Sequence, residues 1–340
     1  DVDAFSIDDS STTEIDDATS VTDIGNGRIK LGIHIAAPSL LIERDSPIDK
    51  VARERLSTVY GPGIKTTMLP PDWIEAASLK EGTNVPCVSL YAVLDSTSMA
   101  IVSTETCVER VPIRANLRYD TFEEEVTQEA ILSGTLRIPY AREIGLLWRF
   151  AKMRQKTRET VRGRPEMPPR PEWYFVLEGE GENARAQIRS RMRGAPIDLV
   201  VSEMMIFANE TWGLWLEEHN TAGIYRSQHM GRVKMSTTPG PHDGLGVVAY
   251  AWSTSPLRRY VDLMNQRQIV RVAMGQTPAY QAKDTDLFTT VTVFESAYEA
   301  YNDFQRRMER YWSLRWIEQE EKKEVTALVV KDELVRIEGL

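Results

Sequence analysis

An acidic string beside an apolar run constrains this chain more than any other feature. Residues 4–21 read AFSIDDSSTTEIDDATSV, and residues 29–42 read IKLGIHIAAPSLLI, a run that a folded protein buries. Carboxylates placed this close together repel one another unless a cation lies among them. The string therefore indicates either a solvent-exposed acidic loop or a site for a divalent metal ion. Its acids are Asp8, Asp9, Glu14, Asp16 and Asp17.

Composition narrows the class of protein. The net charge of -9 argues against a protein that simply coats nucleic acid. The two cysteines, Cys87 and Cys107, lack the spacing of a zinc site or a disulfide framework. We therefore expect a protein of the reducing cytosol. No run approaches the roughly 18 apolar residues of a membrane span. The chain begins with Asp rather than Met, which leads us to expect a fragment of a longer protein.

Two basic stretches stand out against the negative balance. Cationic surfaces that are separate from an acidic metal site would suit an enzyme that cleaves nucleic acid, because they contact phosphates. Solvated basic faces without a partner explain either stretch alone equally well. The first stretch contains Lys152, Arg154, Lys156, Arg158, Arg162 and Arg164, and the second contains Arg185, Arg189, Arg191 and Arg193.

Hydrophobic periodicity and turn residues predict an α/β fold, a mixed sheet surrounded by helices. A GNG turn joins two strands within residues 18–36, and a helix is expected to follow a cap at Thr254 or Ser255. Aromatic residues recur on one face of the last helix and are interpreted as core. Further strands are expected over 85–95 and 99–113, and helices over 46–59, 121–131, 140–158, 196–220 and 284–322.

Oxygen-rich clusters of this kind suit Mg²⁺ or Mn²⁺, which prefer oxygen ligands. Two such ions can clamp the attacking and leaving oxygens of a phosphodiester. The twelve-residue EF-hand is excluded, because counting from Asp8 places Thr13 and Thr19 where that loop needs Gly and Glu. A solvated loop, carboxylates that cap helices, and a glycosidase pair remain open.

Five segments in order resemble the catalytic (RNB) domain of the ribonuclease II/R family. They are AFSIDDSSTTEIDD, GIHIAAPS, STVYGPGIKTTMLP, SEMMIFANE and STSPLRRYVDL, and the resemblance runs from about residue 3 to residue 316. It implies a hydrolytic, processive 3′-to-5′ exoribonuclease that releases nucleoside 5′-monophosphates from single-stranded RNA. It also implies a catalytic domain over 1–322 and the beginning of a C-terminal OB-type RNA-binding domain over 323–340.

Site residues follow from the same resemblance. Asp8, Glu14, Asp16 and Asp17 match the metal-site acids, although the family usually has Asp where this chain has Glu14. Asp16 and Asp17 are also the acids expected to act in catalysis. Arg258 matches an arginine near the scissile phosphate, where it would offset developing charge.

The resemblance assigns the substrate contacts too. Tyr60 matches an aromatic that stacks on a terminal base, and either Tyr174 or Phe175, with Phe175 preferred, matches the opposing aromatic. Glu203 falls where the family places a glutamate near the 3′-terminal nucleotide. A surface or ion-pair role is the alternative. Arg259 has two equal interpretations, a phosphate contact or a structural ion pair.

The expected cofactor is Mg²⁺, with Mn²⁺ as an alternative, in a two-metal mechanism on the 3′ end of single-stranded RNA. We expect no membrane contact, a monomer, and a bacterial cytoplasmic location, with an organelle as the alternative. An RNA-binding scaffold without activity and a nuclease that acts on DNA are the competing functions. His34, on an apolar strand, is expected to be a hydrogen-bonded core histidine.

Overall fold

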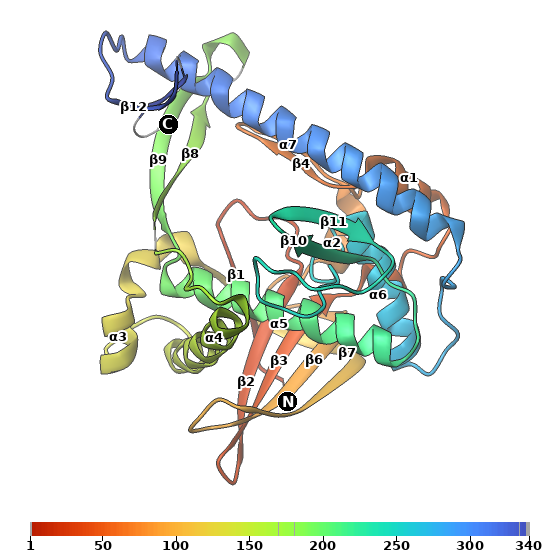
Figure 1. The fold of residues 1–340 in the computed structure, drawn as a ribbon. Coiled ribbons are helices and arrows are strands. Elements are labelled where there is room, and N and C mark those ends of the chain that lie inside the picture. Colours follow the sequence, from red (N-terminus) through yellow and green to blue (C-terminus); the bar gives the residue numbers. More distant parts are fainter. Residues whose placement is uncertain (1, 169, 180, 333, 338–340) are drawn as a thin grey trace.

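A closed five-stranded barrel forms the centre of the computed structural model, which describes residues 2–168, 170–179, 181–332 and 334–337 (Figure 1). The strand order is β1-β2-β3-β6-β7, and parallel pairing of β1 with β7 closes the barrel. All other neighbours are antiparallel, so the predicted mixed sheet is confirmed. The strands are β1 (Ala4–Asp8), β2 (Asp17–Gly25), β3 (Arg28–Ala36), β6 (Asn84–Asp95) and β7 (Ile101–Arg118).

The GNG turn joins β2 to β3 as predicted. Asn26 and Gly27 both have positive φ, 53° and 67°, which is the backbone of a type I′ hairpin turn. Ile29, Leu31, Ile33 and Ile35 alternate along β3 and are all buried. The turn and the alternation together fix which face of β3 enters the core.

His34 is a satisfied core histidine, as expected. It is fully buried, and its Nε2 and Nδ1 atoms each lie 2.8 Å from a hydroxyl oxygen, of Ser20 and Ser89 respectively. Gly32 makes room for this network, because a Cβ there would lie 2.5 Å from the Ser20 Oγ atom. Burial lowers the pKa of His34 to about 4.

We expect this shift to make folding sensitive to acid. The unfolded histidine binds a proton below its ordinary pKa of about 6.5, whereas the folded one stays neutral down to about 4, so stability is lost as pH falls between these values. From about pH 7 to about pH 5 the loss from His34 amounts to about 2 kcal/mol. Urea unfolding of His34→Asn should lack this loss. His229→Asn, at an exposed histidine, should keep it; equal pH dependence in all three proteins would contradict the assignment.

Helices pack around the barrel, and small hairpins lie beside it or extend away from it toward α7 (Figure 1). The helices are α1 (Pro47–Arg55), α2 (Pro71–Ala77), α3 (Gln128–Ser133), α4 (Ala141–Arg162), α5 (Pro196–Glu218), α6 (Tyr260–Ala273) and α7 (Thr285–Gln319). Short 3₁₀ turns cover Pro38–Leu40, Tyr119–Thr121, Glu123–Glu125 and Gly181–Asn183. The hairpins are β4 (Val59–Gly61) with β5 (Ile64–Thr66), β8 (Arg170–Glu178) with β9 (Arg185–Arg193), β10 (Tyr225–His229) with β11 (Arg232–Ser236), and β12 (Ala327–Lys331) with β13 (Leu334–Ile337).

Two large apolar clusters hold these layers together. One packs α4 and α5 against the barrel through residues such as Phe150, Phe207 and Trp212. The other joins α1, α2 and α6 to the first turns of α7, where Phe294 is fully buried. Tyr298 stacks on Phe294 with ring centroids 5.3 Å apart, which confirms the core interpretation for this part of the aromatic face.

The predicted helix over 121–131 was wrong in its first half. Residues 119–125 form two 3₁₀ turns, and α3 begins only at Gln128. The Thr127 hydroxyl then accepts a hydrogen bond from the Ala130 amide at 3.1 Å, which starts α3 at its cap.

The predicted cap at Thr254 or Ser255 was also wrong. Helix α6 begins at Tyr260 and has no side-chain cap. Ser255 instead donates its backbone N–H to the Asp262 carboxylate at 2.9 Å, and residues 257–258 turn toward the acidic string. A helix that began at Pro256 could not make these contacts.

The final hairpin, β12 with β13, lies within residues 323–340, for which we predicted a separate β domain. That domain boundary stays a prediction. Within the described ranges, we find no helix that is both long and apolar enough to span a membrane.

Candidate active site

Strand register brings the acidic string together. Strands β1 and β2 are antiparallel with Phe5 opposite Thr19, and this register, continued along the pair, places Asp8 at the end of β1 beside the start of β2. Asp17 is the first residue of β2 and Asp16 precedes it. The loop 9–16 therefore folds back on itself, and its acids gather at one end of the barrel.

Asp16 is held by the segment that precedes α6. Its Oδ1 accepts a hydrogen bond from the Leu257 amide at 2.8 Å, and its Oδ2 accepts one from the Arg258 Nε at 3.0 Å. The Arg258 side chain remains 42 % exposed, so its outer guanidinium nitrogens can reach a ligand. Asp16 thus orients the one arginine that the resemblance places near a scissile phosphate.

Glu14 is held by a different cation. The Thr58 hydroxyl donates a hydrogen bond to its Oε1 at 2.7 Å, and the Lys65 ammonium lies 2.6 Å from its Oε2. Lys65 also donates to the Thr13 hydroxyl at 2.7 Å. The Glu14 side chain is almost completely buried; its Oε1 accepts a hydrogen bond, whereas its Oε2 forms an ion pair with Lys65 but no hydrogen bond.

Asp8 and Asp17 lack such partners. The Asp8 Oδ2 atom is buried without a hydrogen bond, and Asp17 makes no hydrogen bond or ion pair with the residues that the structure describes. Burial, followed by the charges of Asp8 and Asp16, raises the pKa of Asp17 to about 8. Burial likewise raises the pKa of Asp8 to about 6 and of Asp16 to about 7. Asp8 and Asp17 are therefore the two acids of the site without an ion pair, and the charge of Arg258 offsets their mutual repulsion only in part.

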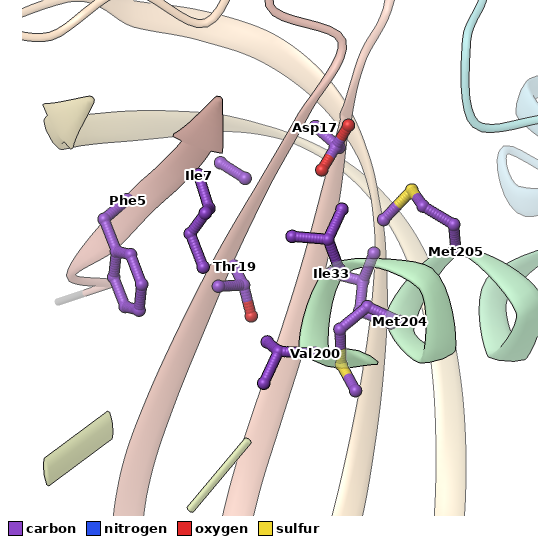
Figure 2. Close-up of a pocket in the computed structure, with 10 residues that line it drawn as sticks. Phe5, Ile7, Asp17, Thr19, Ile33, Val200, Met204 and Met205 are labelled. Carbon is purple, nitrogen blue, oxygen red and sulfur yellow. The ribbon is translucent and has the colours of Figure 1, made fainter. Parts of the chain in front are cut away.

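A small pocket of about 20 Å³ reaches Asp17 from the side of α5 (Figure 2). This volume is about that of one water molecule. Asp17 stands at one end of it, and Ile33, Met204 and Met205 are among the apolar side chains that line it. The apolar wall explains why burial is the largest cause of the raised pKa of Asp17.

The donor set fits a hard divalent cation in part. In the described ranges, no group of three or more His, Cys, Asp or Glu side chains is arranged to hold a metal ion. Glu14 and Asp16 are paired with cationic side chains in this structure, and the assignment of all four acids to a metal ion stays a prediction. Asp8 and Asp17 offer carboxylate oxygens that form no ion pair with the described residues, although Ser6 interacts with Asp8, and two such carboxylates suit Mg²⁺ or Mn²⁺ completed by water and phosphate oxygens.

Tyr60 reaches the site because two distant segments pair. The Thr58 amide donates to the Arg258 carbonyl at 2.9 Å, and a bridge joins Ser57 to Arg259. Tyr60 follows on β4, 39 % exposed, with the Lys65 ammonium 5.8 Å from its ring centroid. Burial and the charge of Glu14 raise the pKa of Tyr60 to about 12, so its phenol is protonated at neutral pH. An exposed ring next to Arg258 is free to stack on a base.

Phe175 and Tyr174 point to opposite faces of β8. Phe175 packs in a small cluster with Trp312 of α7, whereas Tyr174 is 41 % exposed. The cluster lies beside the Tyr60 hairpin, because a Cβ on Gly63 would meet the Leu177 side chain. The exposure favours Tyr174 over the preferred Phe175 as the free aromatic, and the clamp itself stays a prediction.

Glu203 and Arg259 form ion pairs. Glu203 is fully buried and accepts two hydrogen bonds from Arg158, so no substrate can touch it in this conformation. Arg259 binds the Asp262 carboxylate through two nitrogens, at 2.7 and 2.8 Å, and lies over the Trp252 ring. In both cases the ion-pair alternative is the one that the structure adopts.

Several cations of the two basic stretches are also paired rather than free. Arg158 binds Glu203, Arg154 binds Glu210 and Arg162 binds Glu166. In the second stretch, Arg191 and Arg193 both bind Glu172. These partners lie on the same or neighbouring elements, and phosphate contacts by the two stretches stay a prediction.

Thr58 and Lys65 were missed by the sequence interpretation. Both lie in the STVYGPGIKTTMLP segment, and a lysine between an isoleucine and two threonines carries no local signal of a carboxylate partner. The contacts to Glu14 span 44 residues for Thr58 and 51 for Lys65, since 58 and 65 exceed 14 by these amounts. The one indication in the sequence was Glu14 itself, which stands where the family usually has Asp.

Comparison with known proteins places the chain in a family. A model described as the RNB domain matches residues 1–233 and again residues 227–275. The chain is 27 % identical to an uncharacterised ribonuclease of Synechocystis over 341 residues, covering 92 % of this chain and 48 % of the relative. It is also 27 % identical to Exoribonuclease 2 of Serratia proteamaculans, covering 82 % and 51 %, and to Ribonuclease II, chloroplastic/mitochondrial, of Arabidopsis thaliana, covering 99 % and 44 %. The chain thus spans about half the length of these curated relatives.

Solved structures share the fold. An active-site mutant of the Dss1 exoribonuclease from Candida glabrata matches with a TM-score of 0.84 and 21 % identity, over 99 % of this chain and 48 % of that one. Mycoplasma genitalium RNase R in complex with double-stranded RNA matches with a TM-score of 0.85 and 16 % identity, over 100 % and 70 %. Yeast Ssd1, described as a pseudonuclease, matches with a TM-score of 0.71 and 18 % identity, over 90 % and 43 %. On the family model, which covers most of its length, the chain belongs to the RNB domain family.

Proposed function

We propose that this chain is a metal-dependent, processive 3′-to-5′ exoribonuclease that removes nucleoside 5′-monophosphates from single-stranded RNA. The observation that carries the proposal is the Asp8–Asp17 pair, two carboxyl groups that form no ion pair and that lie near the half-exposed Arg258. Two acids without an ion pair suit a divalent ion, and an arginine that is bound to Asp16 but still 42 % exposed suits a phosphate. The names of the relatives support the same activity.

The reaction adds water across the terminal phosphodiester. The water oxygen bonds to phosphorus, the 3′ oxygen of the preceding nucleotide leaves and takes a proton, and the released nucleotide keeps the 5′-phosphate. Asp8 and Asp17 would hold the divalent ion, which lowers the pKa of a bound water and offsets phosphate charge. Asp16 keeps the Arg258 guanidinium oriented toward the phosphate oxygens, where charge develops.

The exposed ring of Tyr60 supports a substrate made of unstacked bases. Stacking on an aromatic ring contributes about 1–3 kcal/mol per base and does not depend on base identity. A single strand can present its terminal base to Tyr60, whereas a duplex must first open. We therefore propose single-stranded RNA as the substrate, Mg²⁺ or Mn²⁺ as the cofactor, and the bacterial cytoplasm as the location.

Arg258→Lys is expected to lower kcat by about tenfold to a hundredfold with little change in KM. Lysine keeps the charge but loses the planar guanidinium that binds Asp16 and phosphate together. Steady-state degradation of a short oligoribonucleotide measures the effect. Arg142→Lys, at an exposed arginine on α4, is the matched control and should match the wild type; an unchanged kcat in Arg258→Lys would remove this residue from the mechanism.

The proposal is tested with a 5′-labelled single-stranded RNA incubated with the protein in Mg²⁺ or in EDTA and resolved on a denaturing gel. We expect a ladder that shortens from the 3′ end only in Mg²⁺, together with free mononucleotides. Internal cuts, or equal degradation in EDTA, would contradict it. A DNA strand of the same sequence in a parallel lane should stay intact.

An RNA-binding scaffold without activity is the second candidate. The fold similarity to yeast Ssd1, whose description is a pseudonuclease, is the observation in its favour. Intact RNA in both lanes, with RNA binding unchanged by EDTA, would support the scaffold. Retention of Asp8, Asp17 and Arg258 supports the enzyme instead.

A further inference from the structure

The acids of the site divide into three groups by partner. Asp16 is bound by Arg258 and the Leu257 amide, and Glu14 is bound by Thr58 and Lys65. The remaining two, Asp8 and Asp17, have no cationic partner within the described ranges. Two of the four acids are therefore already engaged by positive charges that belong to the protein.

Lys65 is the less expected of these cations. It comes from β5, on the short hairpin that also carries Tyr60, and it reaches back to the loop between β1 and β2. Its ammonium touches both Glu14 and Thr13, and its side chain is 30 % exposed. The Glu14 carboxylate is held on its other side by the Thr58 hydroxyl, so a metal ion could bind Glu14 only by displacing Lys65.

Charge balance leads to the same conclusion. When all four carboxyl groups are ionised, as a metal ion would require, their charges against Arg258 and Lys65 leave two net negative charges. Nearby Asp9 and Arg118 add one charge of each sign and leave this balance unchanged. One divalent cation neutralises the remainder, whereas a second would leave an excess of positive charge before RNA binds.

We propose that Lys65 is a positioning residue that occupies the cation position beside Glu14 and limits the free protein to one divalent ion, held by Asp8 and Asp17. This inference rests on the proposed function, because it assumes that the acids bind metal. Lys65 holds Glu14 and the loop 9–16 in place without a second ion. Its ammonium also places a fixed charge next to Tyr60.

The test is the stoichiometry of Mn²⁺ binding to the full chain without RNA, measured by electron paramagnetic resonance of free Mn²⁺. We expect one bound ion in the wild type and two in Lys65→Met, because Glu14 then lacks a cation. The double variant Lys65→Met/Glu14→Gln should return to one. Lys152→Met, at an exposed lysine on α4, is the control and should bind one ion.

Two bound ions in the wild type, none, or a single ion in folded Lys65→Met would each overturn the proposal. Lys65→Gln is measured alongside in case the Met variant fails to fold, because glutamine keeps a polar group next to Glu14. This variant should also bind two ions, and a single bound ion would overturn the proposal. RNA degradation separates this inference from the proposed function. A wild type that binds two ions and degrades RNA refutes only the role of Lys65, whereas one bound ion without degradation refutes only the exonuclease.

Discussion

Asp17→Asn is expected to lower RNA hydrolysis by at least about 10³-fold and to stabilise the metal-free protein. Asp17 has no partner in the described part of the chain, and burial together with Asp8 and Asp16 raises its pKa to about 8. In the unfolded chain Asp17 loses its proton near pH 3.8, whereas in the folded protein it keeps the proton up to about pH 8. The folded state therefore loses stability as pH rises between these two values. Asparagine removes that charge, so unfolding in EDTA near neutral pH should cost at least about 1 kcal/mol more. The same change removes a carboxylate that would bind the ion, which accounts for the loss of hydrolysis.

The two effects separate a metal ligand from a structural acid. In the wild type, Mg²⁺ at about 100 times its Kd should add about 2.7 kcal/mol to the free energy of unfolding, and in Asp17→Asn it should add almost nothing. Asp23→Asn, at an exposed position near the far end of β2, is the matched control and should respond to Mg²⁺ like the wild type. An Asp17→Asn variant that is less stable in EDTA, or that still gains from Mg²⁺, would contradict the account.

Glu203→Gln is expected to destabilise the fold by about 3 kcal/mol or more. The substitution keeps the shape of the side chain but removes the carboxylate that binds the buried Arg158 guanidinium through two hydrogen bonds, and it leaves only Glu166, 3.7 Å away, as an ion-pair partner. Arg158 connects α4 to α5 and also donates to the Leu245 carbonyl, so the loss affects the packing of both helices. Urea denaturation followed by circular dichroism measures the change.

Removing both charges provides the control. Arg158→Met/Glu203→Met should recover much of the stability, because a well-packed apolar pair of similar volume often replaces a buried ion pair at little cost. Glu172→Gln, which loses a half-exposed pair with Arg191, should cost less than about 1 kcal/mol. If Glu203→Gln instead keeps full stability and loses RNA degradation, Glu203 contacts the substrate and the ion-pair assignment fails.

The sequence correctly predicted the turns, strands and helices that depend on contacts between residues close along the chain. The GNG turn, the alternation of β3 and the long periodic helices α4, α5 and α7 all depend on residues that are neighbours along the chain. The start of α6 did not follow its capping residues, because tertiary contacts of Ser255 and Leu257 override the local preference. Closure of the barrel by β1 and β7 pairs strands about a hundred residues apart, and no sequence period reports it.

The candidate site shows the same division. The gathering of Asp8, Asp16 and Asp17 could be predicted, because they flank one short loop. Their charge partners could not, because Arg258 lies 242 residues from Asp16 in the chain. Residue type left two roles open for Glu203, and the sequence did not indicate its ion-pair partner Arg158, 45 residues away. A sequence shows which residues are close along the chain, whereas the pairing of charges between distant segments is known only from the structure.

The most direct test of the central claim is the identity of the first product. A single-stranded RNA whose 3′-terminal nucleotide alone carries a label is mixed with the wild-type protein in Mg²⁺, and the label is followed by thin-layer chromatography. The account predicts that the label appears at once as a nucleoside 5′-monophosphate, and that Asp17→Asn releases none. Label that leaves as a 3′-monophosphate, as an oligonucleotide, or at the wild-type rate from Asp17→Asn would contradict hydrolysis at this acidic site.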